Sequence, residues 1–202
     1  MHVVSDIKRE PRTRGRYGVY VDGVKAFDLS SLDLSTCGLR VGSQISEEGL
    51  AEFEALAESS RAYELAIRFL GVRPRTMYEM KQYLSRKDCP QASIQEALQK
   101  LNSAGLLDDD AFSASWIANR QALRPRSKRM LEQELIAKGV SRESIATALR
   151  QIDGESELEA LVQLAQRKHQ MSQYRDRNKL TAYLARKGYR YELIKMALER
   201  LD

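Results

Sequence analysis

Residues that could perform acid–base, nucleophilic or metal chemistry are few in this chain. The two histidines, His2 and His169, are far apart in a sequence of 202 residues, so a histidine-based general base or metal site has little to draw on. Cys37 and Cys89 form no CxxC motif and no cysteine–histidine cluster, and we interpret them as free thiols of a reduced protein. The motifs GxxxxGK[ST], GxGxxG and HExxH are also absent from the sequence. We therefore predict a non-enzymatic protein with no catalytic residue, metal site or cofactor.

The acidic run Asp108-Asp109-Asp110 and the aromatic pair that follows it each have two interpretations. The carboxylates are able to bind a divalent cation, but they directly precede a helical pattern, where acidic side chains cap the first turn. Phe112 and Trp116 have the spacing of a buried helical stripe, although an exposed aromatic platform for nucleic-acid bases would have the same spacing. We favour a helix cap and core packing, the latter also for Leu131 and Leu135.

Basic residues carry the strongest functional signal. Residues 1–60 contain seven Lys/Arg and ten Asp/Glu, whereas residues 61–202 contain 26 and 18. Two dense basic clusters lie at 120–142 and 167–190, around the junction of the first and second helices of two sequence repeats. Such recurrence favours a stripe that binds phosphates or acidic side chains over an ordinary solvated face. The predicted partner- or DNA-binding residues are Arg73, Arg75, Arg120, Arg124, Arg126, Lys128, Arg129, Arg175, Arg177 and Lys179.

The chain repeats itself at intervals of 51 and 49 residues. Seven positions keep their residue type in three copies, with apolar spacings typical of helices that bury one stripe. A lysine at a helix end recurs with the apolar positions, which chance similarity between amphipathic helices does not easily explain. The first copy has Met80, Leu84, Lys87, Ile94, Ala97, Leu98 and Leu101; the second has Leu131, Leu135, Lys138, Ile145, Ala148, Leu149 and Ile152; the third has Leu180, Leu184, Lys187, Ile194, Ala197, Leu198 and Leu201.

Helix boundaries are marked by capping residues. Ser46 precedes a helical pattern that runs to Leu70, and the segments 76–79 and 93–96 both fit the capping box. Further helices are expected near 108–123, 127–138, 141–152, 155–170, 176–187 and 190–201. Gly139 and Gly188 stand where helices should end in the left-handed conformation. Each copy is thus predicted to hold three helices.

The N-terminal part has a different pattern. Two segments rich in aromatic and β-branched residues, 16–21 and 24–29, flank Asp22-Gly23, which predicts a hairpin because a type I′ turn needs positive φ at both central residues. Residues 39–45 suggest one more short extended segment. The fold class predicted is mainly α, an elongated array of tandem three-helix units with a small N-terminal β-hairpin extension. The expected domains are 1–45, 46–106, 107–153 and 154–202.

Several motifs together resemble those of the RecX regulatory proteins. They are Leu106-Leu107-Asp108-Asp109-Asp110-Ala111-Phe112, then Arg120, then Glu134-Leu135-Ile136-Ala137-Lys138-Gly139-Val140. The segment Arg73-Pro74-Arg75-Thr76 with Glu79-Met80 looks like the first-repeat motif of that family, and the similarity runs from about residue 59 to the end. Ser127 departs from the glycine that many members have before the second-repeat helix, but serine can cap that helix.

The resemblance implies a fold of tandem three-helix units and a partner, the RecA recombinase. Family members bind RecA–single-stranded DNA filaments, lie along the filament groove and lower ATP hydrolysis, strand exchange and RecA-stimulated repressor self-cleavage. Direct binding of single- or double-stranded DNA and a scaffold role for another protein remain the alternatives. The N-terminus lacks a signal peptide pattern and no apolar run is long enough to span a bilayer, so we expect a cytoplasmic monomer without membrane contact.

Overall fold

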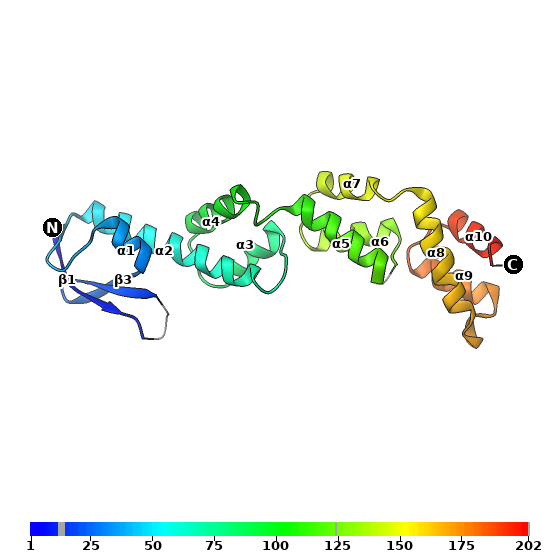
Figure 1. Ribbon diagram of the computed structural model, residues 1–202, viewed down its shortest axis with the longest axis horizontal. Helices are drawn as coiled ribbons and strands as arrows, with labels where there is room; N and C mark the ends of the chain where they lie inside the picture. The colour runs from blue at the N-terminus through cyan, green and yellow to red at the C-terminus, as the bar shows by residue number, and fades with distance from the viewer. Residues whose placement is uncertain (12–14, 124, 202) are drawn as a thin grey trace. The chain divides into compact units, whose positions relative to one another are not determined.

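The computed structural model describes residues 1–11, 15–123 and 125–201, and these contain four strands and ten α-helices (Figure 1). The chain divides into two compact units. The first comprises residues 1–74 and 80–106, and the second comprises residues 75–79 with everything from Leu107 onward. The predicted class is confirmed: a small N-terminal sheet precedes helices that recur in threes. None of the described helices is both long and apolar enough to cross a membrane.

The N-terminal sheet is larger than the predicted hairpin. Asp22 and Gly23 have φ angles of 51° and 83°, so the hairpin turn forms with two positive φ angles as expected. Two further strands complete an antiparallel sheet of order β3-β2-β1-β4. The first strand escaped prediction because Val4 is its one fully buried residue, which leaves a weak alternating pattern. The strands are β1 (His2–Arg9), β2 (Arg16–Val21), β3 (Val24–Ser30) and β4 (Gln44–Ile45).

Two helices cover this sheet. The short helix α1 (Ser31–Cys37) was not predicted; Ser30 caps it by accepting a hydrogen bond from the Asp33 amide. The long helix α2 (Glu47–Leu70) begins after Ser46, whose hydroxyl accepts from the Gly49 amide, as predicted. The N-terminal half of α2 packs on β3, and its C-terminal half packs on the helices of copy one.

Copy one adds α3 (Met77–Ser85) and α4 (Gln91–Ser103) to the end of α2. The capping box before α3 is confirmed, because Thr76 Oγ1 accepts from the Glu79 amide and the Thr76 amide donates to Glu79 Oε2. The second predicted box is wrong. Helix α4 begins three residues earlier, with Pro90 rather than Ser93 at its N-cap, so Ser93 lies inside the helix and is buried.

Copies two and three follow with the predicted helices and one additional 3-10 turn. Ser127 caps the second helix of copy two by accepting from the Met130 amide. Gly139 and Gly188 end their helices with φ angles of 74° and 84°, as expected for the C′ position. Copy two contains α5 (Asp109–Leu123), α6 (Lys128–Ala137) and α7 (Arg142–Arg150); copy three contains α8 (Gly154–His169), η1 (Ser172–Tyr174), α9 (Arg177–Arg186) and α10 (Tyr191–Glu199).

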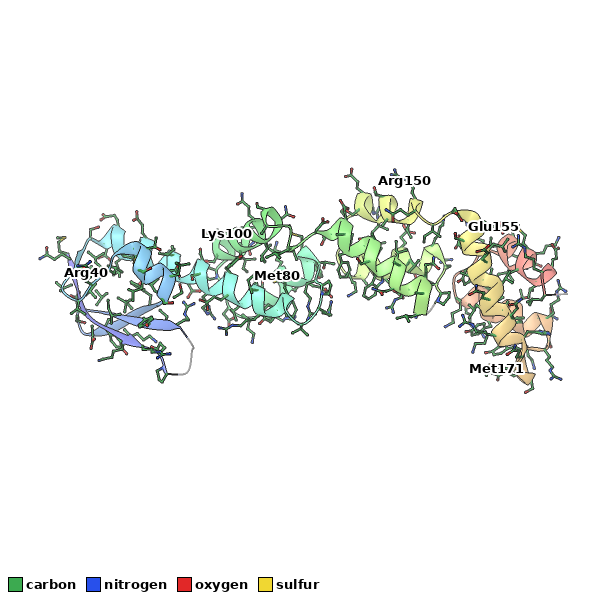
Figure 2. All side chains as sticks on the ribbon, viewed as in Figure 1. Arg40, Met80, Lys100, Arg150, Glu155 and Met171 are labelled. Atoms are coloured by element: carbon green, nitrogen blue, oxygen red, sulfur yellow. The ribbon has the colours of Figure 1, made fainter. Side chains whose placement is uncertain are left out.

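Most of the aligned apolar positions of the three copies are buried in all three. Met80 of copy one matches Leu131 and Leu180, and all three are at most 1% exposed. The next turn of each helix repeats this with Leu84, Leu135 and Leu184, all fully buried. Figure 2 shows Met80 among the helices of its copy, whereas Lys100 projects from the surface. Because each copy buries its own leucine-rich stripe, each has a separate core.

Candidate partner-binding surface

Glu134 of α6 gathers the basic residues of copy two. Its Oε2 atom accepts from Trp116 Nε1 at 2.9 Å and from Arg120 Nε at 2.7 Å. Arg126 forms a longer ion pair with the same carboxylate, at 3.5 Å from Oε1. All four side chains are partly buried, where charge-assisted bonds are strong. Arg120 and Arg126 therefore help to hold α5, α6 and the loop between them together.

Trp116 has cations stacked against its ring. The Arg120 guanidinium carbon lies 4.4 Å from the ring centroid and Lys138 Nζ lies 4.5 Å from it. Lys138 Nζ also pairs with Glu79 Oε1 at 2.9 Å. The indole packs against Phe112, with ring centroids 5.7 Å apart, so the predicted core role of this pair is confirmed. A ring occupied in this way is not an open stacking platform for bases.

Two lysines of copy three lie beside an aromatic ring, and neither is paired with a carboxylate among the described residues. Lys168 and Lys187 lie 5.3 and 5.5 Å from the Tyr183 ring centroid, and Arg167 Nε donates to the Gln163 carbonyl. Among the described residues, none of these three cations forms an ion pair with an acidic side chain. Their charge is thus balanced by solvent ions and remains available to an anionic partner.

A hollow of about 430 Å³ opens beside these lysines, and we name it the basic groove. Among the residues that the structure describes, four that line it are cations and none is acidic, which distinguishes it from the charged hollow of the first unit described below. Its apolar wall includes Leu123, which is 78% exposed. The cations are Arg126, Arg167, Lys168 and Lys187, and the other lining residues are Leu123, Pro125, Leu164 and Tyr183.

The groove is held in shape by a junction between copies two and three. The Ser127 hydroxyl donates to the Lys187 carbonyl at 3.0 Å, and the Lys128 amide donates to Glu157 Oε1 at 3.0 Å. Both bonds satisfy backbone groups at helix ends that lack partners within their own helix. The junction fixes the backbone of Lys187 next to the loop that carries Arg126.

The same exchange of caps occurs once more in the second unit. The Thr76 hydroxyl donates to the Lys138 carbonyl at 2.7 Å, and the Met77 amide donates to Asp109 Oδ1 at 2.9 Å. Burial and the neighbouring acidic residues raise the pKa of Asp109, while the bond from the Met77 amide opposes this shift. A hydroxyl at the N-cap of one copy thus bonds the lysine carbonyl of the next copy at both positions.

Comparison with known proteins gives a consistent result. Sequence models of the first, second and third three-helix domains of RecX match residues 62–101, 108–149 and 155–198. The chain belongs to the RecX family. It is 30% identical to the regulatory protein RecX of Halalkalibacterium halodurans over 98% of this chain and 77% of the relative. It is 28% identical to that of Lactobacillus gasseri over 100% and 76%.

Solved RecX structures share the fold. One crystal structure of regulatory protein RecX superposes with a TM-score of 0.76 at 25% identity, covering 98% of this chain and all of the other. RecX from Lactobacillus salivarius gives a TM-score of 0.65 at 24% identity, over 72% of this chain and 97% of the other. The N-terminal sheet therefore lies within the region that the first structure covers.

The structure distributes the predicted binding residues of this RecX family member over several environments. Of the predicted residues that the structure describes, Arg126 lines the basic groove, and Arg120 belongs to the Glu134 cluster. Arg129 is exposed on α6, Lys128 is half-buried at the junction, and Arg124 lies outside the described residues. Arg175, Arg177 and Lys179 are exposed around the start of α9; Arg73 is exposed and Arg75 half-buried before α3.

Three residues of the groove are not among the predicted contact residues. Arg167, Lys168 and Lys187 belong to the basic cluster at 167–190. A signal for Lys187 exists, because Tyr183 and Lys187 lie four residues apart on one helical face. Copy one repeats this spacing with Tyr83 and Lys87, whose Nζ lies 5.9 Å from the ring centroid.

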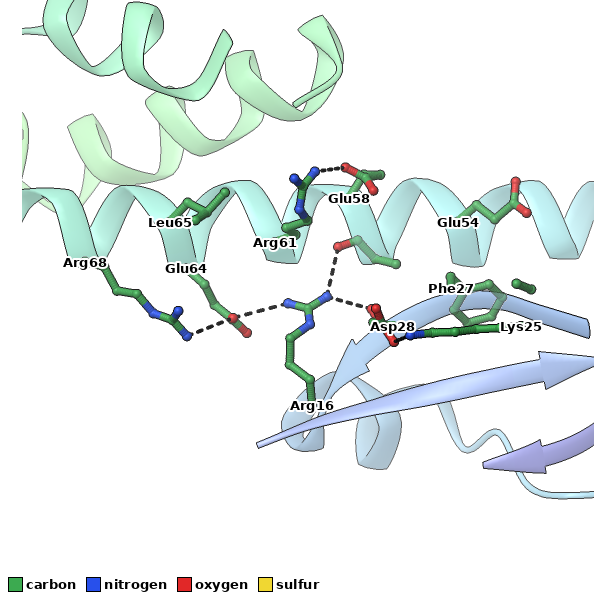
Figure 3. A pocket seen from close by; sticks show the side chains of 12 residues that line it. Arg16, Lys25, Phe27, Asp28, Glu54, Glu58, Arg61, Glu64, Leu65 and Arg68 are labelled. Carbon is green, nitrogen blue, oxygen red and sulfur yellow. Dashed lines mark hydrogen bonds and ion pairs between the residues drawn. The ribbon is translucent and has the colours of Figure 1, made fainter. Parts of the chain in front are cut away.

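A second hollow, of about 540 Å³, lies in the first unit between β3 and α2 (Figure 3). The buried Arg16 crosses it, and its Nη2 atom donates to the Asp28 carbonyl at 2.7 Å while Nη1 pairs with Glu64 at 3.2 Å. Figure 3 also shows Arg68 reaching the same Glu64 carboxylate. Acidic and basic side chains pair with one another here, so this hollow joins a helix to a sheet rather than presenting charge.

The other residues with reactive or titratable side chains cap a helix, are buried or form ion pairs. Asp108 Oδ1 accepts from the amides of Asp110 and Ala111, which confirms the predicted cap of α5. Burial raises the pKa of the Cys89 thiol, which disfavours the reactive thiolate. His2 lies between two carboxylates, with Nδ1 2.7 Å from Asp22 and Nε2 2.7 Å from Glu47.

Proposed function

We propose that this chain binds the RecA–single-stranded DNA filament and restrains it as a non-enzymatic regulator. In this role it lowers RecA ATP hydrolysis, strand exchange and RecA-stimulated repressor self-cleavage, and so acts in recombination and the SOS response. Membership of the RecX family supports the regulatory role. The observation that carries the proposal is the basic groove, whose described lining residues include four cations and no acidic residue.

The repeated architecture suits a partner that is itself repetitive. Each copy holds a lysine over an aromatic ring at the same helix end: Lys87, Lys138 and Lys187. A filament offers identical surfaces at regular intervals, and several weak contacts in one chain gain affinity through high effective concentration. Binding of this kind is stoichiometric and weakens with salt, because it depends on exposed charges.

Titration of the chain into a RecA ATPase assay on single-stranded DNA tests the proposal. We expect inhibition to be complete near a stoichiometric amount relative to the filament, and no change at that amount would contradict the proposal. The double variant Arg175→Glu/Lys179→Glu reverses two exposed charges at the start of α9 and should require about tenfold more protein. Arg142→Glu/Arg150→Glu, on the exposed face of α7, is the matched control.

Direct DNA binding is the second candidate, and the same basic groove favours it. This function predicts tight binding of DNA without RecA, with a steep loss of affinity as salt rises. Micromolar or weaker affinity at physiological salt, measured by fluorescence anisotropy, would argue against it.

A further inference from the structure

We propose that the basic groove binds an acidic segment of the protein partner, with an apolar side chain of that segment seated on Leu123 and Leu164. The proposal rests on the proposed function for the identity of the partner, and it adds which chemistry the groove recognises. It treats the groove as a peptide site rather than a nucleic-acid site.

The charges of the groove require an anionic occupant. Lys168, Lys187 and Arg167 have no carboxylate partner among the described residues, and the lining contains no acidic side chain. Arg126 is balanced by its ion pair with Glu134 at 3.5 Å. Carboxylates entering between these cations would form charge-assisted hydrogen bonds in a partly enclosed space.

The apolar wall selects among anions. Leu123, at the end of α5, is 78% exposed. Pro125 and Leu164 of α8 line the groove with it and continue its apolar surface. An exposed leucine next to a concave surface is the kind of position that an apolar anchor residue of a partner fills. Inorganic anions gain nothing from this wall, whereas a segment with both acidic and aliphatic residues gains from both parts.

The aromatic ring of the groove argues against bases as the occupant. Single-stranded nucleic acid is usually held by bases that stack on open aromatic rings. Tyr183 is the aromatic residue among the described lining of the groove, and two cations already lie over its ring at 5.3 and 5.5 Å. A base that stacks there has to displace a lysine, which removes the charge that would attract its phosphate.

Fluorescence anisotropy with defined probes tests this inference on the full chain. The probes are a short labelled peptide of aspartate and leucine, the same peptide with every leucine replaced by serine, and labelled oligothymidylate. We expect the first to bind about tenfold more tightly than the serine peptide, as a buried leucine anchor implies. Tighter binding of oligothymidylate that competes with the peptide would overturn the inference, as would failure of the aspartate–leucine peptide to bind.

Three variants locate the binding. Lys168→Gln/Lys187→Gln removes two charges and keeps side-chain length, and Leu123→Ser removes the exposed anchor surface. Each should weaken binding of the aspartate–leucine peptide by about tenfold or more, with unchanged circular dichroism. Arg142→Gln/Arg150→Gln is the control of equal charge change, and it should bind as the unmodified chain does. Equal affinity in all variants would refute the assignment to this groove.

The RecA ATPase assay separates this inference from the function on which it rests. If the unmodified chain inhibits RecA and Lys168→Gln/Lys187→Gln inhibits equally, the groove assignment fails and the proposed function stands. If the unmodified chain does not inhibit RecA, the proposed function fails, whatever the peptide affinity.

Discussion

Copies two and three place a lysine at the same helix end beside an aromatic ring but surround it with different charges. Lys138 pairs with Glu79 and shares the Trp116 ring with Arg120, which in turn bonds Glu134. Lys187 has a tyrosine beside it and no acidic partner among the residues that the structure describes. The same repeat position thus contributes to stability in copy two and presents charge in copy three. High local basic charge alone does not distinguish the two roles.

Substitution of the glycine that follows Lys138 or Lys187 is expected to have the largest effect on the free energy of unfolding. The two substitutions also allow the two junctions to be compared. A Cβ at Gly139 would overlap Tyr78 Cβ, which cannot move without the backbone, whereas a Cβ at Gly188 would meet Met130 Cγ at 2.8 Å and Ser127 Oγ at 2.6 Å. Both glycines also have positive φ. We predict that Gly139→Ala lowers the free energy of unfolding by about 2–4 kcal/mol and Gly188→Ala by less. Urea denaturation measures both, and the reverse order would contradict the packing described at the two junctions.

Removing the acidic centre of copy two should have the next largest effect. Glu134→Gln leaves two partly buried arginines without their carboxylate, and we predict a loss of about 2–3 kcal/mol in the free energy of unfolding. Lys168→Gln in copy three should change it by less than about 0.5 kcal/mol, since that lysine forms no ion pair within the described part of the chain. Similar losses in both variants would remove the distinction between the copies.

Removal of the Ser127 hydroxyl at the junction is expected to have the third largest effect on the free energy of unfolding. Ser127→Ala removes both the cap of α6 and the bond to the Lys187 carbonyl, and we predict a loss of about 1–2 kcal/mol in the free energy of unfolding. Ser127→Thr keeps the hydroxyl and should retain most of the stability. If the alanine variant unfolds at the same urea concentration as the unmodified chain, the junction contributes nothing to stability.

Substitution of His2, which pairs with Asp22 and Glu47 near the surface, is expected to have the smallest effect on stability. The hydrogen bond to Glu47, and to a smaller extent the one to Asp22, raises the pKa of His2 above 6.5. Because the folded-state pKa is the higher one, its contribution to stability is fully present below pH 6.5 and is lost as the pH rises through the folded pKa. His2→Asn should flatten this part of the stability–pH curve, and thermal unfolding at several pH values measures it. A curve identical to that of the unmodified chain would show that the histidine is not linked to folding.

Local signals carried much of the fold prediction. The threefold apolar pattern, Thr76 and Ser127 as caps, and the C′ glycines act within a few residues, so sequence spacing reveals them. The strand β1 was not predicted because it depends on pairing with β2 and β4, which lie elsewhere in the sequence. The start of α4 was predicted wrongly because Ser93 fits a capping box, whereas the helix begins after Pro90 and buries Ser93.

The candidate site was predictable only in part. Basic residues concentrate in copies two and three, and this much is visible in the sequence. Whether a cation is neutralised depends on contacts across the fold, such as Lys138 with Glu79, 59 positions apart. Arg120 and Arg126 were predicted as contact residues, and their pairing with Glu134 could not be inferred from local charge counts. That they bind a partner stays a prediction.

We infer above all that the groove cations without an ion pair among the described residues, Lys168 and Lys187 with Arg167, contact the RecA filament. The most direct test is the amount of protein needed to halve RecA ATPase activity on single-stranded DNA, compared between the unmodified chain, Lys168→Gln/Lys187→Gln and the Arg142→Gln/Arg150→Gln control. We expect the groove variant to need about tenfold more protein than the unmodified chain and the control to need the same amount. An equal requirement for all three proteins would contradict it.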